Sequence, residues 1–362
     1  MKTFHSLEEQ YWDIYRPLYM EQYINPKNIE EEKRTFLEAY YKAEIYNPVF
    51  TYKTLPKEVD EKMLQLDALC QVFKQSKHPL AEYYVLLIIQ TLKSLEAFQS
   101  RDTNAEHFNS WLSALYDAPS ATLAQYAKHM LETVKIHKEE ETMSSEELAN
   151  IFTHALEERG FKGWKIVVEE MPARMSINQM DKMVKINKNA TFSSSEVERL
   201  KVHEINTHIL RAENAKKQPY LLFQYGFPAY LKTEEGLAIL SEEKHGLLSE
   251  YDRQKYALRV LACGYALEHS FYEVFVYLHR YLDADDAFSM TLRVKRGMTD
   301  TAKKGGYTKD QVYLDGYLML KEEPLSTISK LYYGKIGLEN VKVLDSLEHL
   351  ENVLVYPEWV KK

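Results

Sequence analysis

The stretch Lys201-Val-His-Glu-Ile-Asn-Thr-His208 places two histidines and a glutamate on what the sequence predicts to be one helix, running from about Ser194 to Asn214. His203 and His208 offer imidazole nitrogens, and Glu204 offers a carboxylate beside the first of them. Two imidazoles and an adjacent carboxylate make up most of a zinc-hydrolase site. The spacing is HExxxH, however, which is one residue longer than the common HExxH.

The extra residue changes which way the two histidines face. In a regular helix, residues at i and i+4 lie about 40° apart, whereas residues at i and i+5 lie about 140° apart. One residue looped out as a π-bulge would bring both rings back to one side, and such bulges are frequent at functional sites. The sequence therefore predicts either a bulge near residues 205–207 or two histidines with unrelated roles on a helix surface.

A third metal ligand is expected from a second stretch, Thr233-Glu-Glu-Gly-Leu-Ala238. A catalytic zinc takes three protein ligands and leaves one position open, and a carboxylate is a common third ligand. Thr233 is predicted to cap a helix in which Glu234 and Glu235 are both candidate ligands, with Gly236 allowing close approach to the HExxxH helix. The alternative is that both glutamates are first-turn acids favoured by the helix dipole.

The surroundings predict an α+β fold that is mostly α-helical. Short β-branched segments predict a small sheet just before the HExxxH helix, the expected arrangement for a zincin core. Apolar residues at three- and four-residue spacing predict helices over most of the remaining chain. The predicted strands are 164–170, 174–177 and 183–187, and the predicted helices include 7–15, 29–46, 57–75, 79–99, 104–116, 120–138, 251–282, 285–295 and 309–321. We divide the chain into a helical N-terminal region, residues 1–142, and a zincin-like catalytic domain, residues 143–362.

Composition narrows the possible functions. The net charge of -8 argues against general nucleic-acid binding, which needs a basic surface. The N-terminus lacks the apolar segment of a secretory signal, and no run of about 18 uncharged apolar residues predicts a membrane span. Cys70 and Cys263 lie far apart in apolar runs and are expected to be buried free thiols. A cytoplasmic protein with no membrane or nucleic-acid partner is the expectation.

The motifs together resemble one family. They are His-Glu-Ile-x-Thr-His at 203–208, Gln218-Pro219, the segment at 233–238, Arg293-Val-Lys-Arg-Gly297, and Gly306-Tyr-Thr-Lys-Asp310 with Tyr313 and Gly316 beyond. Over roughly residues 160–320 the chain resembles the tubulin-tyrosine metallocarboxypeptidase family, whose bacterial members are called flavohaemoglobin expression-modulating QEGLA-motif proteins. One departure is that Glu234 replaces the glutamine of QEGLA, whereas the following Glu235 is retained.

The resemblance implies a Zn²⁺ carboxypeptidase with a gluzincin-like core that acts on a peptide or protein C-terminus. It selects Glu235 as the third ligand beside His203 and His208, and it leaves Glu204 as the general base. A terminal carboxylate needs a cation, for which arginine's planar fork is well suited. The basic residues in matching motifs are Arg293, Arg296 and Lys309, and either Tyr307 or Tyr313 is expected to donate to the developing oxyanion.

The expected last residue of the substrate is large and apolar or aromatic, since the animal enzymes of the family remove tyrosine. Acidic tubulin tails would be repelled by a chain of this net charge, and a shorter chain looks closer to the bacterial branch. The alternative function is an inactive or regulatory binding protein that retains the zinc helix as structure. The intact Glu204 favours the enzyme, because a binding protein needs no general base beside a metal ligand.

Overall fold

The computed structural model describes residues 3–101, 103–133, 139–171, 174–352 and 354–361. The described chain forms two compact units. The first unit contains residues 1–134 and 254–311, and the second contains residues 135–253 and 312–362. Each unit therefore combines two separate stretches of sequence, and the domain boundary expected after residue 142 stays a prediction.

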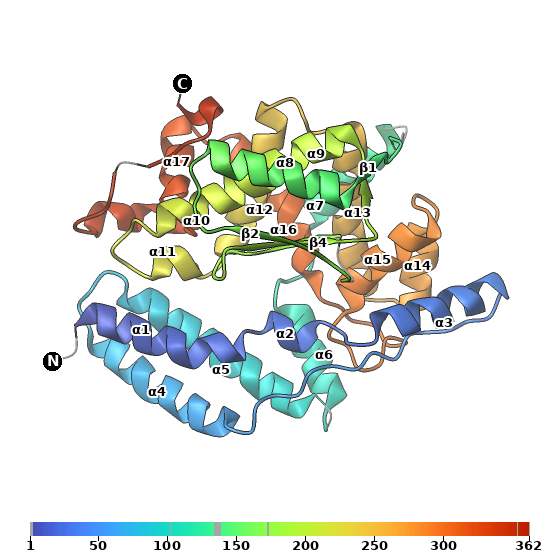
Figure 1. The fold of residues 1–362 in the computed structure, drawn as a ribbon. Coiled ribbons are helices and arrows are strands. Elements are labelled where there is room, and N and C mark those ends of the chain that lie inside the picture. The colour runs from blue at the N-terminus through green and yellow to red at the C-terminus, as the bar shows by residue number, and fades with distance from the viewer. Residues whose placement is uncertain (1–2, 102, 134–138, 172–173, 353, 362) are drawn as a thin grey trace. The chain divides into compact units, whose positions relative to one another are not determined.

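The first unit is built from helices (Figure 1). Its elements are α1 (Phe4–Tyr15), η1 (Arg16–Leu18), α2 (Glu21–Ile24), α3 (Ile29–Tyr41), α4 (Val59–Gln75), α5 (Ala81–Ser100), α6 (Ala105–Ala114), α7 (Ala121–Thr133), the part of α13 (Glu250–Ala266) from residue 254 onward, α14 (Phe271–Leu278), α15 (Ala284–Lys295) and η3 (Thr308–Gln311). Six N-terminal helices were predicted within a few residues of these bounds, while α2 was missed. The predicted end of the last one, at 134–138, lies outside the described residues. Cys70 and Cys263 are buried free thiols, as predicted.

One predicted helix of this unit is wrong. The sequence predicts a continuous helix over residues 251–282, but the structure has α13 and α14 separated at Ser270. The hydroxyl of Ser270 accepts a hydrogen bond from the Glu273 backbone, and the Glu273 carboxylate accepts one from the Ser270 N–H at 2.8 Å. This capping box starts a new helix, so His269 precedes α14 and does not share a helix face with Glu273.

The second unit contains the predicted sheet. Its strands β2 (Lys165–Glu169), β4 (Met183–Asn187) and β3 (Met175–Asn178) lie in that order, with β2 parallel and β3 antiparallel to β4. In the central strand Val184 and Ile186 are fully buried and alternate with less buried residues, as expected of a strand with one apolar face. A two-stranded sheet pairs β1 (Met143–Ser144) with β5 (Thr191–Phe192). These short sheets and the many helices agree with the α+β, mostly helical prediction.

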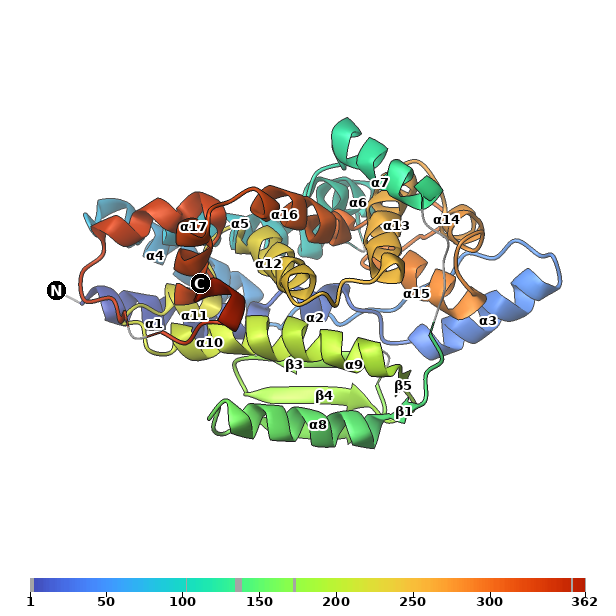
Figure 2. The same ribbon diagram turned by 90° about the horizontal axis from the view of Figure 1, so that it is seen from above.

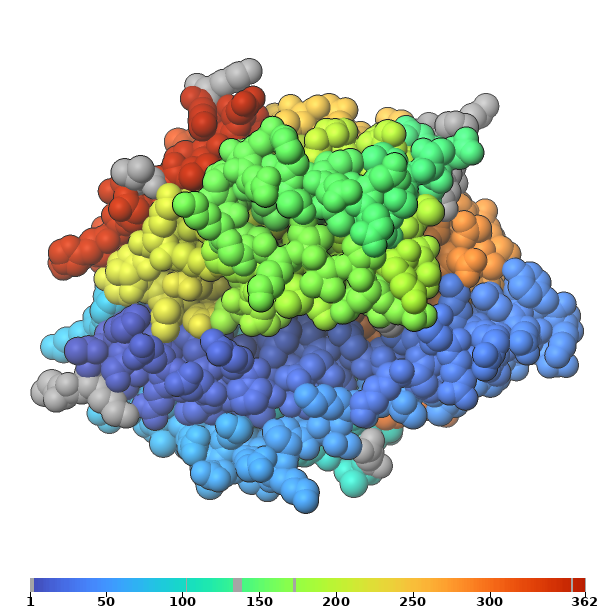
Figure 3. All heavy atoms as spheres, in the orientation of Figure 1, coloured from blue at the N-terminus to red at the C-terminus, as the bar shows by residue number. Residues whose placement is uncertain are grey.

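The helices of the second unit carry the predicted metal site. They are α8 (Ser145–Glu158), α9 (Ser194–Leu200), η2 (Lys201–Ile209), α10 (Leu210–Ala215), α11 (Leu222–Tyr225), α12 (Tyr230–Lys244), α16 (Val312–Lys321), α17 (Leu325–Lys330), η4 (Leu331–Tyr333), η5 (Leu338–Ser346) and η6 (Glu358–Val360). Helix α8 packs against β2, β4 and η2, and it runs beside the continuous α9–η2–α10 helix over the sheet (Figure 2). The opposite side of α8 lies at the surface of the unit (Figure 3).

Helix α12 is buried along nearly its whole length and packs against both η2 and α16. It begins at Tyr230, so the prediction that Thr233 caps it is wrong. Thr233 lies inside the helix, and its hydroxyl accepts a hydrogen bond from the Leu338 N–H at 2.9 Å. Gly236 also has a different neighbour from the one expected. It lies against Gly316 of α16, where an added Cβ would be 2.7 Å from the Gly316 Cα and closer still to its carbonyl group.

Replacing Gly236 with alanine should therefore lower the free energy of unfolding by about 3 kcal/mol, because the new methyl group overlaps the backbone of α16 and no flexible side chain can yield. Urea unfolding followed by circular dichroism measures the loss. Gly264→Ala is the matched control, since a Cβ there would meet its nearest atom at an ordinary 3.9 Å. A Gly236→Ala variant as stable as the wild type would contradict the close packing of α12 and α16.

Within the described part of the chain, no helix combines the length and the apolar character needed to cross a bilayer.

Candidate metal centre

The helix that carries His203 and His208 is bulged. Residues Lys201–Ile209 form a π-helix between two α-helical segments, and the backbone N–H of Leu210 donates to the carbonyl of Ile205, five residues earlier. The hydroxyl of Thr207 donates to the carbonyl of Val202 at 3.1 Å. Because a π-helix turn contains about one extra residue, residues five apart lie on the same side. The bulge predicted from the HExxxH spacing is confirmed.

The two imidazoles meet one carboxylate. The centroids of the His203 and His208 rings lie 4.9 Å apart, and both side chains are buried. Each Nε2 atom is 3.7 Å from Oε2 of Glu235 on α12. One potential ligand atom from each of the three residues lies within 4.8 Å of the others. The two 3.7 Å separations are close to the about 3.3 Å between ligand atoms around a tetrahedral zinc with bonds of about 2.0 Å.

The second nitrogen of each ring is held by another carboxylate. Nδ1 of His203 lies 2.6 Å from Oε1 of Glu242, and Nδ1 of His208 lies 2.7 Å from Oε1 of Glu234. Because a carboxylate accepts hydrogen bonds, each Nδ1 carries the proton and each Nε2 is directed to the cluster. Glu234 is therefore a support for His208, and Glu235 is the carboxylate that joins the two imidazoles.

Two arginines continue these contacts. Arg199 Nη1 lies 2.9 Å from Oε1 of Glu242, and its Nε lies 3.2 Å from Asp252. Arg211 Nη1 pairs with Oε2 of Glu234. The result is an arginine–glutamate–histidine series on each side of the cluster.

The electrostatic effects inside the site are large because it is buried. Burial lowers the pKa of His203, but the hydrogen bonds with Glu235 and Glu242 outweigh burial and raise it to about 10. The pKa of His208 is raised in the same way, against the effect of burial, by Glu234 and Glu235. Burial raises the pKa of Glu234, but Arg211 and His208 lower it to about 2. The supporting carboxylates are therefore ionised at neutral pH, and the site strongly favours positive charge at the two rings.

The charged groups of the site suit a divalent cation. Three carboxylates, those of Glu234, Glu235 and Glu242, lie against the two imidazoles, and two arginines pair with Glu234 and Glu242. Two imidazoles and one carboxylate are also the donor set of the His₂Glu zinc hydrolases. The residues therefore fit zinc.

Glu204 is the remaining acid of the HExxxH motif. It is half-buried on η2, beside His203. Among the residues that the structure describes, none forms a hydrogen bond or ion pair with its carboxylate. A carboxylate next to a metal ligand, with its oxygens uncommitted, is able to take a proton from a water molecule at the cluster.

The predicted substrate-binding residues lie in two different units. Arg293, Arg296 and Lys309 belong to the first unit, and Tyr313 belongs to α16 in the second. Tyr313 precedes Gly316 by about one turn, and Gly316 packs against the residue that follows Glu235. Tyr313 is thus on an element in contact with the helix of a candidate ligand.

The three basic residues are bound to carboxylates. The Arg293 guanidinium makes a two-pronged pair with the buried Asp310. Lys309 Nζ lies 2.6 Å from Oε1 of Glu21, and Arg296 Nη2 lies 3.8 Å from its Oε2. Burial raises the pKa of Glu21, but Lys309 and Arg296 lower it to about 2. Two cations thus share one carboxylate and leave a positive charge unbalanced.

Tyr307, the other predicted oxyanion donor, is fully buried in the first unit. Its hydroxyl lies 3.1 Å from Oε1 of Glu21, and the Arg296 guanidinium lies 5.0 Å from its ring centre. Tyr307 therefore serves the cluster around Glu21 and is a weaker candidate for contact with a reacting peptide than Tyr313.

Arg199, Arg211 and Glu242 belong to the site but were not predicted from the sequence. The signal was spacing: Glu242 follows Glu235 by seven residues, two helical turns, and so lies on the same side of α12. Arg199 precedes His203 by four residues, which places it on the same side of its own helix. Arg211 gave no comparable signal, because its partners include a segment more than 100 residues away.

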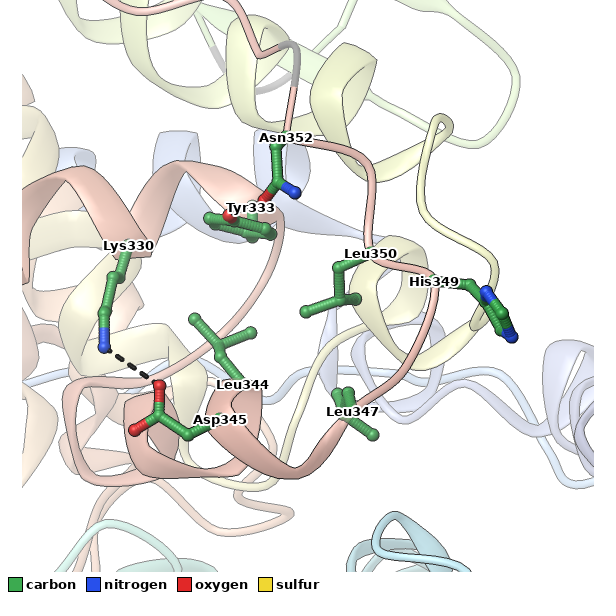
Figure 4. A pocket seen from close by; sticks show the side chains of 8 residues that line it. All are labelled: Lys330, Tyr333, Leu344, Asp345, Leu347, His349, Leu350 and Asn352. Carbon is green, nitrogen blue, oxygen red and sulfur yellow. Dashed lines mark hydrogen bonds and ion pairs between the residues drawn. The ribbon is translucent and has the colours of Figure 1, made fainter.

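A surface cavity of about 450 Å³ lies in the C-terminal part of the second unit (Figure 4). Its lining includes Lys330, Tyr333, Leu344 and Leu350, and Lys330 pairs with Asp345 at 3.3 Å. None of the predicted catalytic, metal or substrate residues lines it.

Comparison with known proteins identifies related sequences. The family model described as "Microtubule-associated tyrosine carboxypeptidase" matches residues 34–362. The human protein "Microtubule-associated tyrosine carboxypeptidase 1" is 27% identical over 348 residues, which cover 92% of this chain and 63% of the relative. The mouse protein of the same name is 35% identical over 170 residues, or 44% of this chain and 35% of the relative. Human "Putative tyrosine carboxypeptidase MATCAP2" is 34% identical over 162 residues, or 42% of this chain and 30% of the relative. The chain spans less than two thirds of the length of these relatives.

Proposed function

Since the chain belongs to the microtubule-associated tyrosine carboxypeptidase family, as its motifs predicted, we propose that it is a zinc carboxypeptidase that removes the last residue of a peptide or protein. The observation that carries the proposal is the convergence of His203, His208 and Glu235 on one point beside Glu204. Only the bulge in η2 makes this convergence possible. The names of the relatives support tyrosine as the residue removed.

The proposed mechanism assigns one task to each residue. His203, His208 and Glu235 would hold the ion, while Nδ1 of His203 donates a hydrogen bond to Glu242 and Nδ1 of His208 donates one to Glu234. A zinc ion bound there would supply a Lewis acid that lowers the pKa of water towards ~7 and polarises the scissile carbonyl. Glu204 accepts the proton of the attacking water and returns it to the leaving amine. The hydroxyl of Tyr313 is proposed to donate to the oxyanion that develops on the carbonyl.

The substrate's terminal carboxylate is proposed to bind to Arg296 and Lys309. These two cations share Glu21 and keep one unbalanced positive charge, whereas Arg293 is neutralised by Asp310. Arg293 then contributes by holding Asp310, and this pair fixes the segment that carries the preceding residue, Lys309. A terminal carboxylate would take up the unbalanced charge, which an amidated terminus cannot do.

Peptides that differ only at their ends test this function. We expect zinc-loaded protein to remove a terminal tyrosine from a free-acid peptide and to process the C-terminally amidated peptide at least about 100-fold more slowly, because the charge-assisted contacts are lost. Mass spectrometry of the products identifies the bond cut. A peptide with a blocked N-terminus is the control and should be cleaved normally.

Other products would each point elsewhere. Cleavage confined to internal bonds would make the protein an endopeptidase, and trimming from the N-terminus would make it an aminopeptidase. No cleavage of any free-acid peptide by protein that holds one zinc per chain would favour the inactive or regulatory binding protein.

A further inference from the structure

The C-terminal part of the second unit reaches the metal centre through Arg211. This side chain is fully buried. Its Nε donates to the carbonyls of Leu331 and Gly334, both at 3.0 Å, and its Nη2 donates to the carbonyl of Ile336 at 2.9 Å. Nη1 pairs with Glu234. Four acceptors thus fix a guanidinium that has five N–H groups, so its position is set by residues 331–336.

The series continues to a candidate ligand. Glu234 uses one oxygen for Arg211 and the other for Nδ1 of His208. The equivalent series at His203 ends differently, because Arg199 pairs with Asp252 at the start of α13. The series at His208 therefore includes residues 331–336, whereas the series at His203 leads to Asp252 at the start of α13.

Gly334 holds this segment in place by close packing. Its φ of +156° is rare for other residues, and an added Cβ would lie 2.7 Å from the carbonyl oxygen of Phe223 and 3.0 Å from the Cβ of Ala215. The next residue, Lys335, donates its N–H to the same Phe223 carbonyl at 2.8 Å. Alanine at position 334 would push the backbone away from Phe223. The carbonyl groups that accept hydrogen bonds from Arg211 would move with it.

We infer that residues 331–336 are a positioning element of the metal centre, which acts through Arg211 and Glu234 to set the orientation of His208. The inference rests on the proposed zinc site. A carboxylate on the second nitrogen of a ligating histidine fixes its ring and makes it a better ligand, and losing such a partner typically weakens metal binding by about 10–100-fold. A change at Gly334, which is no ligand, should therefore weaken zinc binding.

Zinc affinity, measured by competition with a chromogenic chelator, tests this. We expect Gly334→Ala and Glu234→Gln each to weaken zinc binding by about 10–100-fold. The visible spectrum of the cobalt-substituted protein should shift in both variants, because it reports ligand geometry. Gly246→Ala is the matched control: its φ is +70°, but nothing lies within 4 Å of the added Cβ. It strains the backbone without touching the series, so its zinc affinity should match that of the wild type.

A double-mutant cycle separates this role from simple loss of packing. Gly334→Ala combined with Glu234→Gln should weaken zinc binding little more than either change alone, because both changes interrupt the same series. Gly334→Ala combined with Glu242→Gln should weaken zinc binding more than either change alone, because it interrupts both series. If Gly334→Ala does not fold, Arg211→Lys takes its place, since a lysine cannot bind three carbonyls and Glu234 in the same geometry.

The inference would be overturned if folded Gly334→Ala bound zinc as tightly as the wild type. It would also be overturned if combining Gly334→Ala with Glu234→Gln weakened zinc binding by the product of the two single fold-changes. In that case stoichiometric zinc and peptide cleavage by the wild type would leave the proposed function standing. A wild type without stoichiometric zinc would overturn both.

Discussion

Replacing Glu204 with glutamine should lower kcat for removal of a terminal residue by about 10⁴-fold, the upper end of what a general acid–base group contributes. The same side chain is proposed to accept a proton and to return it, so its loss affects both halves of the reaction. Glutamine has nearly the same shape and removes no ligand. The variant should therefore keep one zinc per chain and bind peptide with a KM close to that of the wild type.

Glu198→Gln is the matched control for this variant. Glu198 lies on α9, is half-exposed and pairs with Lys201 at 2.7 Å, so it is a nearby glutamate with no place in the site. Its turnover should equal that of the wild type. If Glu204→Gln retains more than about a tenth of wild-type turnover, another group is the base.

Removing His208 should cost more zinc affinity than removing either of its supports. His208→Ala deletes one of three proposed ligands, so the loss should exceed the about 100-fold upper value for a supporting carboxylate. It also leaves Glu234 buried without its imidazole partner, and the free energy of unfolding should fall by about 1–3 kcal/mol. Zinc content after dialysis against a chelator and urea unfolding measure the two effects.

His154→Ala controls for the loss of a histidine as such. His154 is exposed on α8, and its Nδ1 lies 3.4 Å from Oε1 of Glu158. Zinc content and stability should stay at wild-type values in this variant. Normal zinc content in His208→Ala would exclude His208 as a ligand and would leave the bulge of η2 without a function.

The sequence predicted the structure correctly where nearby residues determine it. The i to i+5 spacing of His203 and His208 predicted a bulge if both rings face one side, and the structure has a π-helix there. Alternating β-branched residues marked β2, β3 and β4. In both cases the signal and its hydrogen-bond partners lie within one short stretch of sequence, residues 201–210 for the bulge and 165–187 for the three strands.

Features that depend on distant contacts were missed or misjudged. The start of α12 was placed at Thr233, but this hydroxyl binds the backbone of Leu338, more than 100 residues away. Gly236 was assigned to the wrong neighbour, because only the fold reveals that Gly316 faces it. Arg211 was overlooked for the same reason. Its three carbonyl acceptors belong to residues 331–336, a segment for which the sequence predicts no functional residue.

The central claim is that the bulged helix and α12 hold one zinc ion between His203, His208 and Glu235. Diffraction data from crystals of the zinc-loaded protein, collected on both sides of the zinc absorption edge, test it most directly. The account predicts one anomalous peak per chain, about 2.0–2.2 Å from Nε2 of both histidines and from an oxygen of Glu235. A peak at another place, or none in crystals grown with stoichiometric zinc, would contradict it.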